Sequence, residues 1–159
     1  MHILITGMSG TGKSTAIALL RERGFTAIDT DEPEWLVPDD RHDSEWLWDE
    51  AKIHHLLERH RGTPLFMAGT RENQGRFYDR FAHVVLLSAP IEVMLDRVTA
   101  RPTNPFGSRQ WEREKIARDL AEFEPILRRG ASEEYDTSTM TPDMLVDRLV
   151  TLIHELRQI

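Results

Sequence analysis

Short apolar runs alternate with segments of helical periodicity along the whole chain. A buried strand is expected at residues 2–6, a short strand at 25–29, and apolar-rich strands at 64–68 and 82–88. Residues 132–136 are the candidate for a fifth strand. Between these segments, apolar residues recur at the spacing of one helix face. This spacing predicts helices over 13–23, 44–61 and 109–129, one that begins at Pro90, and one that begins at Thr141-Pro142. Alternating strands and helices favour one α/β domain over residues 1–159, with three layers (α/β/α) and a five-stranded parallel sheet.

The segment after the first predicted strand has the pattern of a phosphate-binding loop. Ligands of parallel sheets bind beyond the carboxyl ends of the strands, and here the chain matches G-x-x-x-x-G-K-[ST] between a strand and a helix. Backbone N–H groups and the helix N-terminus would hold the phosphates of ATP, with Lys13 at the β- and γ-phosphates and Ser14 at Mg²⁺. The alternative is a turn that only joins strand to helix. The predicted nucleotide-binding residues are Gly7, Met8, Ser9, Gly10, Thr11, Gly12, Lys13, Ser14 and Thr15.

Composition and charge narrow the class of protein further. The 159 residues include no Cys, which excludes a disulfide framework, a thiolate metal site and a Cys nucleophile. The formal net charge of −7 disfavours nucleic acid or an anionic membrane as the main partner. No apolar run is long enough to span a membrane, and the N-terminus lacks the basic region of a signal peptide. We therefore expect a cytoplasmic protein, either a monomer or a homodimer.

The first fifteen residues resemble the P-loop kinases of small molecules, which include nucleoside monophosphate, shikimate and gluconate kinases. The chain is most similar to a bacterial subgroup of AAA-type ATP-binding proteins that are adenylate-kinase-like or shikimate-kinase-like. That similarity extends to the stretches E-N-Q-G-R-F-Y at 72–78 and T-N-P-F-G at 103–107. The resemblance implies a P-loop NTPase fold like that of the nucleoside monophosphate kinases, with ATP and Mg²⁺ as cofactors. It also implies an acceptor-binding segment at about 31–62 and a short lid at about 101–109.

Acidic residues follow the second predicted strand, as Asp29-Thr30-Asp31. The strands at 64–68 and 82–88 do not end in Asp or Glu, unlike the strand that holds Mg²⁺ in motor-type ATPases. An Asp-x-Asp at this place resembles the shikimate kinases. The resemblance implies that Asp29 lies near Mg²⁺ and that Asp31 accepts the proton of a substrate hydroxyl. A solvated acidic turn is the alternative, and Ala68 departs from the glycine-rich turn of shikimate kinases.

Arginines flank the predicted lid. Arg97 and Arg101 lie four residues apart at the end of a helix, and the kinase resemblance places Arg97 near the adenine or α-phosphate and Arg101 at the γ-phosphate. Arg109 would join them on closure. Arginines at helix C-termini also stabilise the helix dipole without any ligand. By the same resemblance Asp136 and Thr137, after the last strand, belong to the loop that contacts adenine.

The acceptor site is the least constrained part of the sequence. Trp35, Trp46 and Trp48 lie in the acceptor-binding segment and would either stack against a substrate or pack in the core. Arg71 after the third strand is the candidate ligand for an acceptor anion. Asn73 and Gln74 would bind a polar acceptor or cap the next helix.

These observations favour an ATP-dependent phosphotransferase that moves the γ-phosphate to the hydroxyl of a small molecule. Its predicted catalytic residues are Lys13, Asp31 and Arg101. One alternative is a nucleoside monophosphate kinase, for which Arg41, Arg59, Arg61 and Arg71 would hold the acceptor phosphate. A further alternative is an ATP-binding switch that is not a kinase. An RNA kinase would require a basic face that this composition does not provide.

Overall fold

The computed structural model of the chain describes residues 1–100 and 109–158. The strands are β1 His2–Thr6, β2 Ala27–Asp29, β3 Leu36–Pro38, β4 Trp46–Trp48, β5 Leu65–Ala68, β6 His83–Ser88 and β7 Glu133–Asp136. The helices are α1 Lys13–Glu22, α2 Glu50–Arg59, α3 Ile91–Thr99, α4 Gln110–Gly130 and α5 Pro142–Leu156, together with the 3-10 segments η1 Pro33–Trp35 and η2 Glu72–Arg80. No helix of the described ranges is long and apolar enough to cross a membrane.

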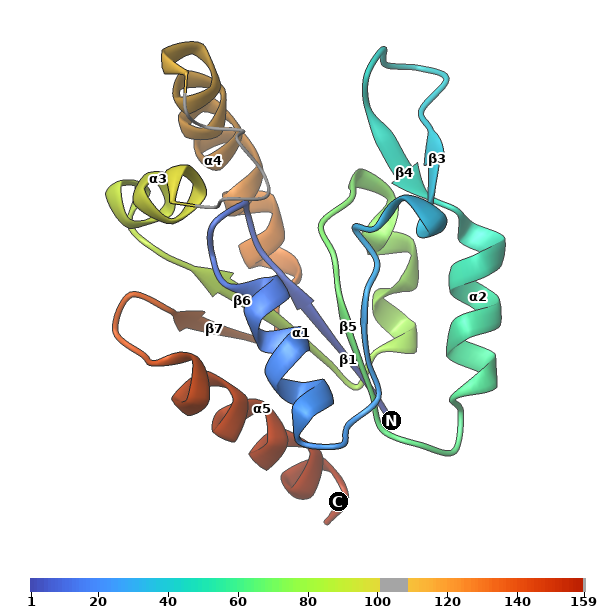
Figure 1. The fold of residues 1–159 in the computed structure, drawn as a ribbon. Helices are drawn as coiled ribbons and strands as arrows, with labels where there is room; N and C mark the ends of the chain where they lie inside the picture. Colours follow the sequence, from blue (N-terminus) through green and yellow to red (C-terminus); the bar gives the residue numbers. More distant parts are fainter. Residues whose placement is uncertain (101–108, 159) are drawn as a thin grey trace.

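Five of the strands form one parallel sheet in the order β2-β5-β1-β6-β7 (Figure 1). Strand β1 lies at the centre and pairs with β5 and β6, with Ile5 opposite both Ala68 and Val85. The predicted α/β class and the five-stranded parallel sheet are therefore confirmed. Parallel pairing brings the ends of β1, β2 and β5 to the same edge of the sheet.

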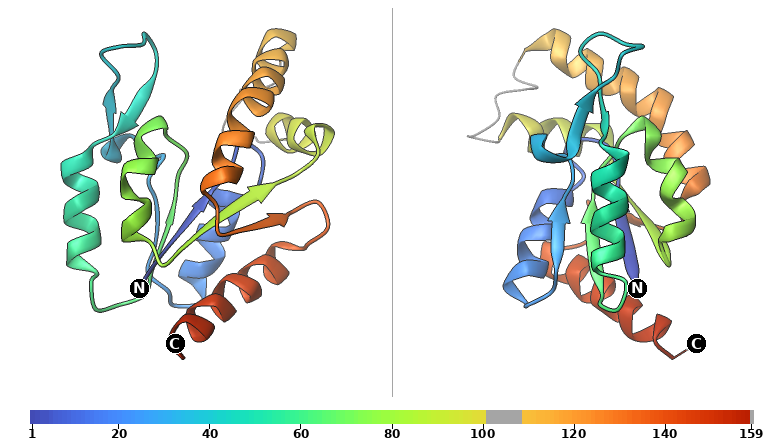
Figure 2. Two further views of the ribbon diagram at one scale, coloured as in Figure 1. Left: turned by 180° about the vertical axis from the view of Figure 1, so that it is seen from behind. Right: turned by 90° about the vertical axis from the view of Figure 1, so that its right-hand side faces the viewer.

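Helices α1 and α5 lie on one face of this sheet and α2 and η2 on the other (Figure 2), and a hydrophobic cluster fills the space on each face. Side chains alternate between the faces of a strand, so Ile3 and Ile5 of β1 pack with α1 and α5, whereas Leu4 packs on the opposite face with α2 and η2. A third cluster joins α3 to α4 and includes Met8 of the loop after β1. The phosphate-binding loop thus starts from the central strand, whose five residues are all buried.

The predicted helix over 44–61 is wrong in its first third. Residues 46–48 form strand β4, which pairs antiparallel with β3, and α2 begins only at Glu50. Two local features explain the difference. The Asp49 side chain accepts a hydrogen bond from the backbone N–H of Lys52 at 3.2 Å and so caps α2. Trp48 is fully buried and packs edge-to-face on Phe77, which a continuous helix would not permit.

Gly69 allows β5 to pass close to its neighbours. A Cβ atom at this position would lie 2.5 Å from the Thr30 Oγ1 atom and 2.9 Å from the ring of Trp48. We expect Gly69→Ala to lower the free energy of unfolding by about 1–3 kcal/mol through overpacking, as measured by denaturant titration. Gly75→Ala is the matched control because a Cβ there meets nothing within 4 Å. Equal stability of the two variants would contradict this packing.

Candidate active site

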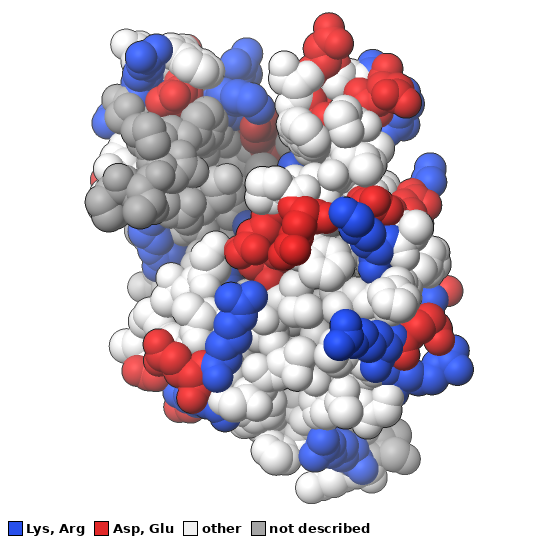
Figure 3. All heavy atoms as spheres, turned by 45° about the vertical axis from the view of Figure 1, so that its right-hand side comes forward, with Lys and Arg blue, Asp and Glu red and all other residues white. Residues whose placement is uncertain are grey.

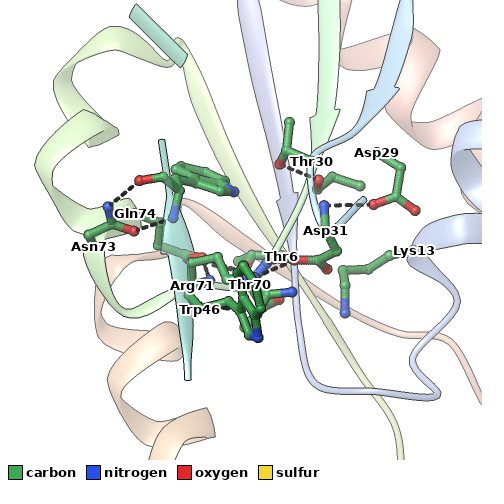
Figure 4. Close-up of polar contacts among 12 residues, drawn as sticks. Thr6, Lys13, Asp29, Thr30, Asp31, Trp46, Thr70, Arg71, Asn73 and Gln74 are labelled. Atoms are coloured by element: carbon green, nitrogen blue, oxygen red, sulfur yellow. Dashed lines mark hydrogen bonds and ion pairs between the residues drawn. The ribbon is translucent and has the colours of Figure 1, made fainter. Parts of the chain in front are cut away.

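Three segments meet at the carboxyl edge of the sheet (Figure 4). The P-loop, residues 7–14, follows β1, the turn with Asp29 and Asp31 follows β2, and Thr70-Arg71 follows β5. These are the positions at which ligands of parallel sheets bind. The predicted residues of the P-loop and of the Asp29-Thr30-Asp31 turn are therefore brought together.

Glycines are required at two places in the P-loop. Gly7 has φ 149°, and a Cβ there would lie 2.3 Å from the backbone O of Leu87. Gly10 has φ 84°, and its Cβ would lie 2.8 Å from the backbone O of Met94. The loop then enters α1 through Gly12, whose φ of 104° is again in the region that favours glycine. No hydrogen bond from the Gly12 position caps α1, and a helix N-terminus that follows such a loop favours an anion.

Lys13 and Ser14 are the first two residues of helix α1 and directly follow the glycines of the P-loop. The half-buried Lys13 ammonium group donates to the backbone O of Gly7 and, at 3.2 Å, to that of Met8. It therefore lies inside the loop, where phosphate oxygens would compete for it. The Ser14 hydroxyl donates to Oδ2 of Asp29 at 3.2 Å. A hydroxyl and a carboxylate are hard oxygen ligands of the kind that Mg²⁺ prefers, so this pair fits the predicted metal site.

Asp31 is held by the segment that follows β5. Its Oδ1 atom accepts from the backbone N–H of Thr70 at 3.2 Å and from Nε of Arg71 at 3.0 Å. The Asp31 and Arg71 side chains are 29% and 23% exposed, so the ion pair is accessible to a ligand. A second Arg71 nitrogen donates to the backbone O of Trp46 at 3.5 Å. The predicted substrate residues Asp31 and Arg71 are therefore in contact with each other.

Thr70 joins this acid to the P-loop. Its hydroxyl donates to the backbone O of Gly7 at 2.6 Å and accepts from the N–H of Gly7 at 3.2 Å. Its own N–H is the donor to Asp31. Thr6, at the end of β1, contacts the same hydroxyl at 3.2 Å. Sequence analysis missed Thr70 and Thr6, although both are polar residues at the ends of apolar strands.

Asn73 and Gln74, predicted to contact the acceptor, are buried, with 8% and 2% of their surface exposed. The Asn73 amide donates to the backbone O of Trp48 at 3.0 Å and accepts from its N–H at 3.1 Å. The Gln74 amide accepts from the N–H of Arg71 at 2.9 Å and donates to Thr6 and Tyr78. Their polar atoms thus fix β4 and the Arg71 turn, which argues for support of the site rather than acceptor contact.

Arg97 links three parts of the nucleotide end of the site. One nitrogen donates to the backbone O of Gly10 at 3.1 Å and to the Thr137 hydroxyl at 2.8 Å, and another donates to the backbone O of Thr137 at 2.9 Å. The Thr137 hydroxyl donates in turn to the backbone O of Thr11 at 2.8 Å. Arg97 and Thr137 therefore brace the P-loop against the loop after β7. Direct contact of Arg97 with adenine or the α-phosphate stays a prediction.

The structure describes two further predicted residues, Asp136 and Arg109. Asp136 is exposed and accepts from the backbone N–H of Ser138 at 2.9 Å, which shapes the loop after β7. Arg109 precedes α4, and its N–H donates to Glu112 at 3.0 Å. Arg101 and most of the predicted lid lie outside the described residues.

The comparisons with known proteins agree with this geometry. A family model described as an AAA domain matches residues 3–122, so the chain belongs to this family of P-loop domains. The resemblance to AAA-type ATP-binding proteins is confirmed at the level of family, and the resemblance to small-molecule P-loop kinases at the level of fold. No curated protein sequence matches the chain.

Solved structures cover almost the whole chain. A shikimate kinase from Acinetobacter baumannii in complex with shikimate matches with a TM-score of 0.66 and 23% identity, over 97% of this chain and 93% of its own. The YorR protein of Bacillus subtilis, in complex with phosphorylated GDP, matches with a TM-score of 0.64 and 17% identity, over 100% and 99% of the two chains. A shikimate kinase from Bacteroides thetaiotaomicron matches with a TM-score of 0.61 and 17% identity, over 100% and 99%. At these identities the similarity establishes the fold.

Removal of the Arg97 guanidinium tests its bracing role. We expect Arg97→Met to weaken MgATP binding about ten-fold, by calorimetry, because the loop loses a charged hydrogen-bond donor. The variant should also lose about 1–2 kcal/mol of stability without nucleotide. Arg118→Met, at an exposed position of α4, is the control. Unchanged stability together with lost affinity would instead indicate that Arg97 contacts the nucleotide directly.

Proposed function

We propose that the protein is an ATP-dependent phosphotransferase that transfers the γ-phosphate to a hydroxyl group of a small molecule. One observation carries the proposal. Thr70 bonds the P-loop through its hydroxyl and Asp31 through its N–H. A phosphate-binding loop and a candidate base are therefore fixed relative to each other, as phosphoryl transfer requires.

The residues of the site divide the chemistry among them. The backbone of the P-loop and the ammonium group of Lys13 bind the β- and γ-phosphates and neutralise the charge that moves during transfer. Ser14 and Asp29 would hold Mg²⁺, which supplies further charge neutralisation when bound. Both hydrogen bonds to Asp31 use its Oδ1 atom, so Oδ2 is the oxygen available to the proton of an attacking hydroxyl.

The arginines support a hydroxyl acceptor over a nucleoside monophosphate. Arg41 forms ion pairs with Asp39 and, at 3.2 Å, with Glu72. Its hydrogen bond to the Asp39 carboxylate lowers the pKa of Asp39. Arg61 is paired with Glu58 at 2.8 Å. Arg59 lines a groove between α2 and η1 that contains none of the P-loop residues. Of the four arginines that a monophosphate site would use, only Arg71 lies at Asp31.

A nucleoside monophosphate kinase remains the second candidate, because the B. subtilis neighbour was solved with phosphorylated GDP. A non-kinase switch would bind MgATP but would not require a general base such as the Asp31 carboxylate. The products distinguish the three functions. A hydroxyl kinase forms a phosphomonoester, a nucleoside monophosphate kinase forms a nucleoside diphosphate, and a switch transfers no phosphate to an added acceptor.

Two substitutions separate the roles of Lys13 and Asp31. We expect Lys13→Ala to abolish MgATP-dependent phosphoryl transfer with the fold intact, as seen by circular dichroism. We expect Asp31→Asn to lower acceptor-stimulated ADP release about 100-fold or more, the range for loss of a general base, while MgATP affinity changes little.

Glu32→Gln is the matched control, because Glu32 is an exposed acid of the same turn. Full activity of Lys13→Ala would overturn the role of the P-loop. Equal losses of transfer and of MgATP binding in Asp31→Asn would indicate that Asp31 binds the metal or stabilises the fold and does not act on the acceptor.

A further inference from the structure

The β3–β4 hairpin presents one tryptophan on the side of the candidate active site. Pro38 pairs with Trp46 and Leu36 with Trp48, and side chains two residues apart share a face of a strand. Trp48 faces the core, where its ring lies against Gly69 and Phe77. Trp46 therefore extends from the same face of the hairpin, beyond the edge of the core.

Trp46 lies next to the residues that would receive the acceptor. Its backbone O accepts from Arg71, which is bonded to Asp31 (Figure 4). Its surface is 47% exposed, whereas Trp48 is fully buried. A large apolar ring left open beside a polar site is a surface on which the flat face of a ligand would stack.

The same site is poorly suited to an anionic acceptor. The Arg71 guanidinium already donates to Asp31 and to the backbone O of Trp46, and its pairing with Asp31 leaves no net positive charge. Arg76, which follows Arg71 in the chain, is paired with Glu50 at 2.7 Å. The turn after β2 adds the carboxylates of Asp29 and Glu32, and Figure 3 shows acidic side chains gathered at the centre of this face.

We propose that Trp46 determines the acceptor specificity of this site. It stacks against the flat face of an uncharged, ring-bearing hydroxyl compound, such as a sugar, a cyclitol or a nucleoside, whose hydroxyl lies at Asp31. The inference rests on the proposed phosphotransferase function and adds the class of acceptor to it. Arg71 is then a positioning residue that orients Asp31, and it does not bind a substrate carboxylate or phosphate.

The acceptors for the test are matched pairs that differ in charge: glucose with glucuronate, and adenosine with AMP. We expect the neutral member of a pair to stimulate ADP release more than its anionic partner, and the two pairs distinguish a sugar acceptor from a nucleoside. Preference for glucuronate, for AMP or for added shikimate would overturn the proposal.

Variants of Trp46 test its contact with the acceptor that gives the strongest stimulation. Trp46→Ala should raise the KM for that acceptor about ten-fold, the effect of losing one stacking interaction. The KM for MgATP should not change, and Trp46→Phe should restore most of the loss. Trp111→Ala is the control, because Trp111 is 55% exposed on α4. An unchanged acceptor KM in Trp46→Ala, or an equal rise in the KM for MgATP, would overturn the proposal.

Collisional quenching tests the charge of the site without any catalysis. The emission of Trp46, obtained as the difference between the wild type and Trp46→Phe, should be quenched more by caesium than by iodide when each is expressed relative to its quenching of free N-acetyltryptophanamide. Stronger relative quenching by iodide would overturn the inference that the site rejects anions. If caesium is preferred but no acceptor of any charge is phosphorylated, the proposed function fails while the inferred charge of this surface is supported.

Discussion

The hydrogen bonds of Thr70 are the interaction on which the candidate site depends. Parallel pairing of β1 with β5 places Ile5 opposite Ala68, so the residues that follow the two strands meet. The Thr70 hydroxyl then bonds both backbone groups of Gly7, and its N–H bonds Asp31. The phosphate-binding loop, the segment after β5 and the acid after β2 are thus joined in one hydrogen-bond network, which the proposed phosphoryl transfer would require.

Buried polar side chains hold this unit from both sides. Asn73 and Gln74 fix the hairpin and the Arg71 turn on the acceptor side, whereas Arg97 and Thr137 brace the P-loop on the nucleotide side. Each of these contacts is worth only about 0.5–1.5 kcal/mol, or up to 3 where a charge takes part. Their main effect is to reduce the freedom of the residues that would touch a ligand, since precise sites depend on the support behind them.

The sequence predicted the parts of this structure that local pattern determines. Strands β1, β5 and β6 coincide with buried apolar runs, and the glycines of the P-loop motif mark the places where its backbone turns. The hairpin was missed because Leu47 can be counted with the apolar side of the helix that follows, whereas burial of Trp48 against Phe77 fixes these residues in a strand. The bracing roles of Thr70, Gln74 and Arg97 depend on partners far away in the chain, such as Gly7 for Thr70 and Thr137 for Arg97. Spacing along the sequence does not encode such contacts.

The most direct test of this account identifies the chemical bond that the transferred γ-phosphate forms in the product. Phosphorus NMR of the protein with MgATP and a pool of small hydroxyl compounds and nucleoside monophosphates separates three products by chemical shift. The account predicts a new phosphomonoester signal together with ADP, because we propose that Asp31 activates a hydroxyl. A new nucleoside diphosphate in place of a phosphomonoester, or inorganic phosphate alone, would contradict it.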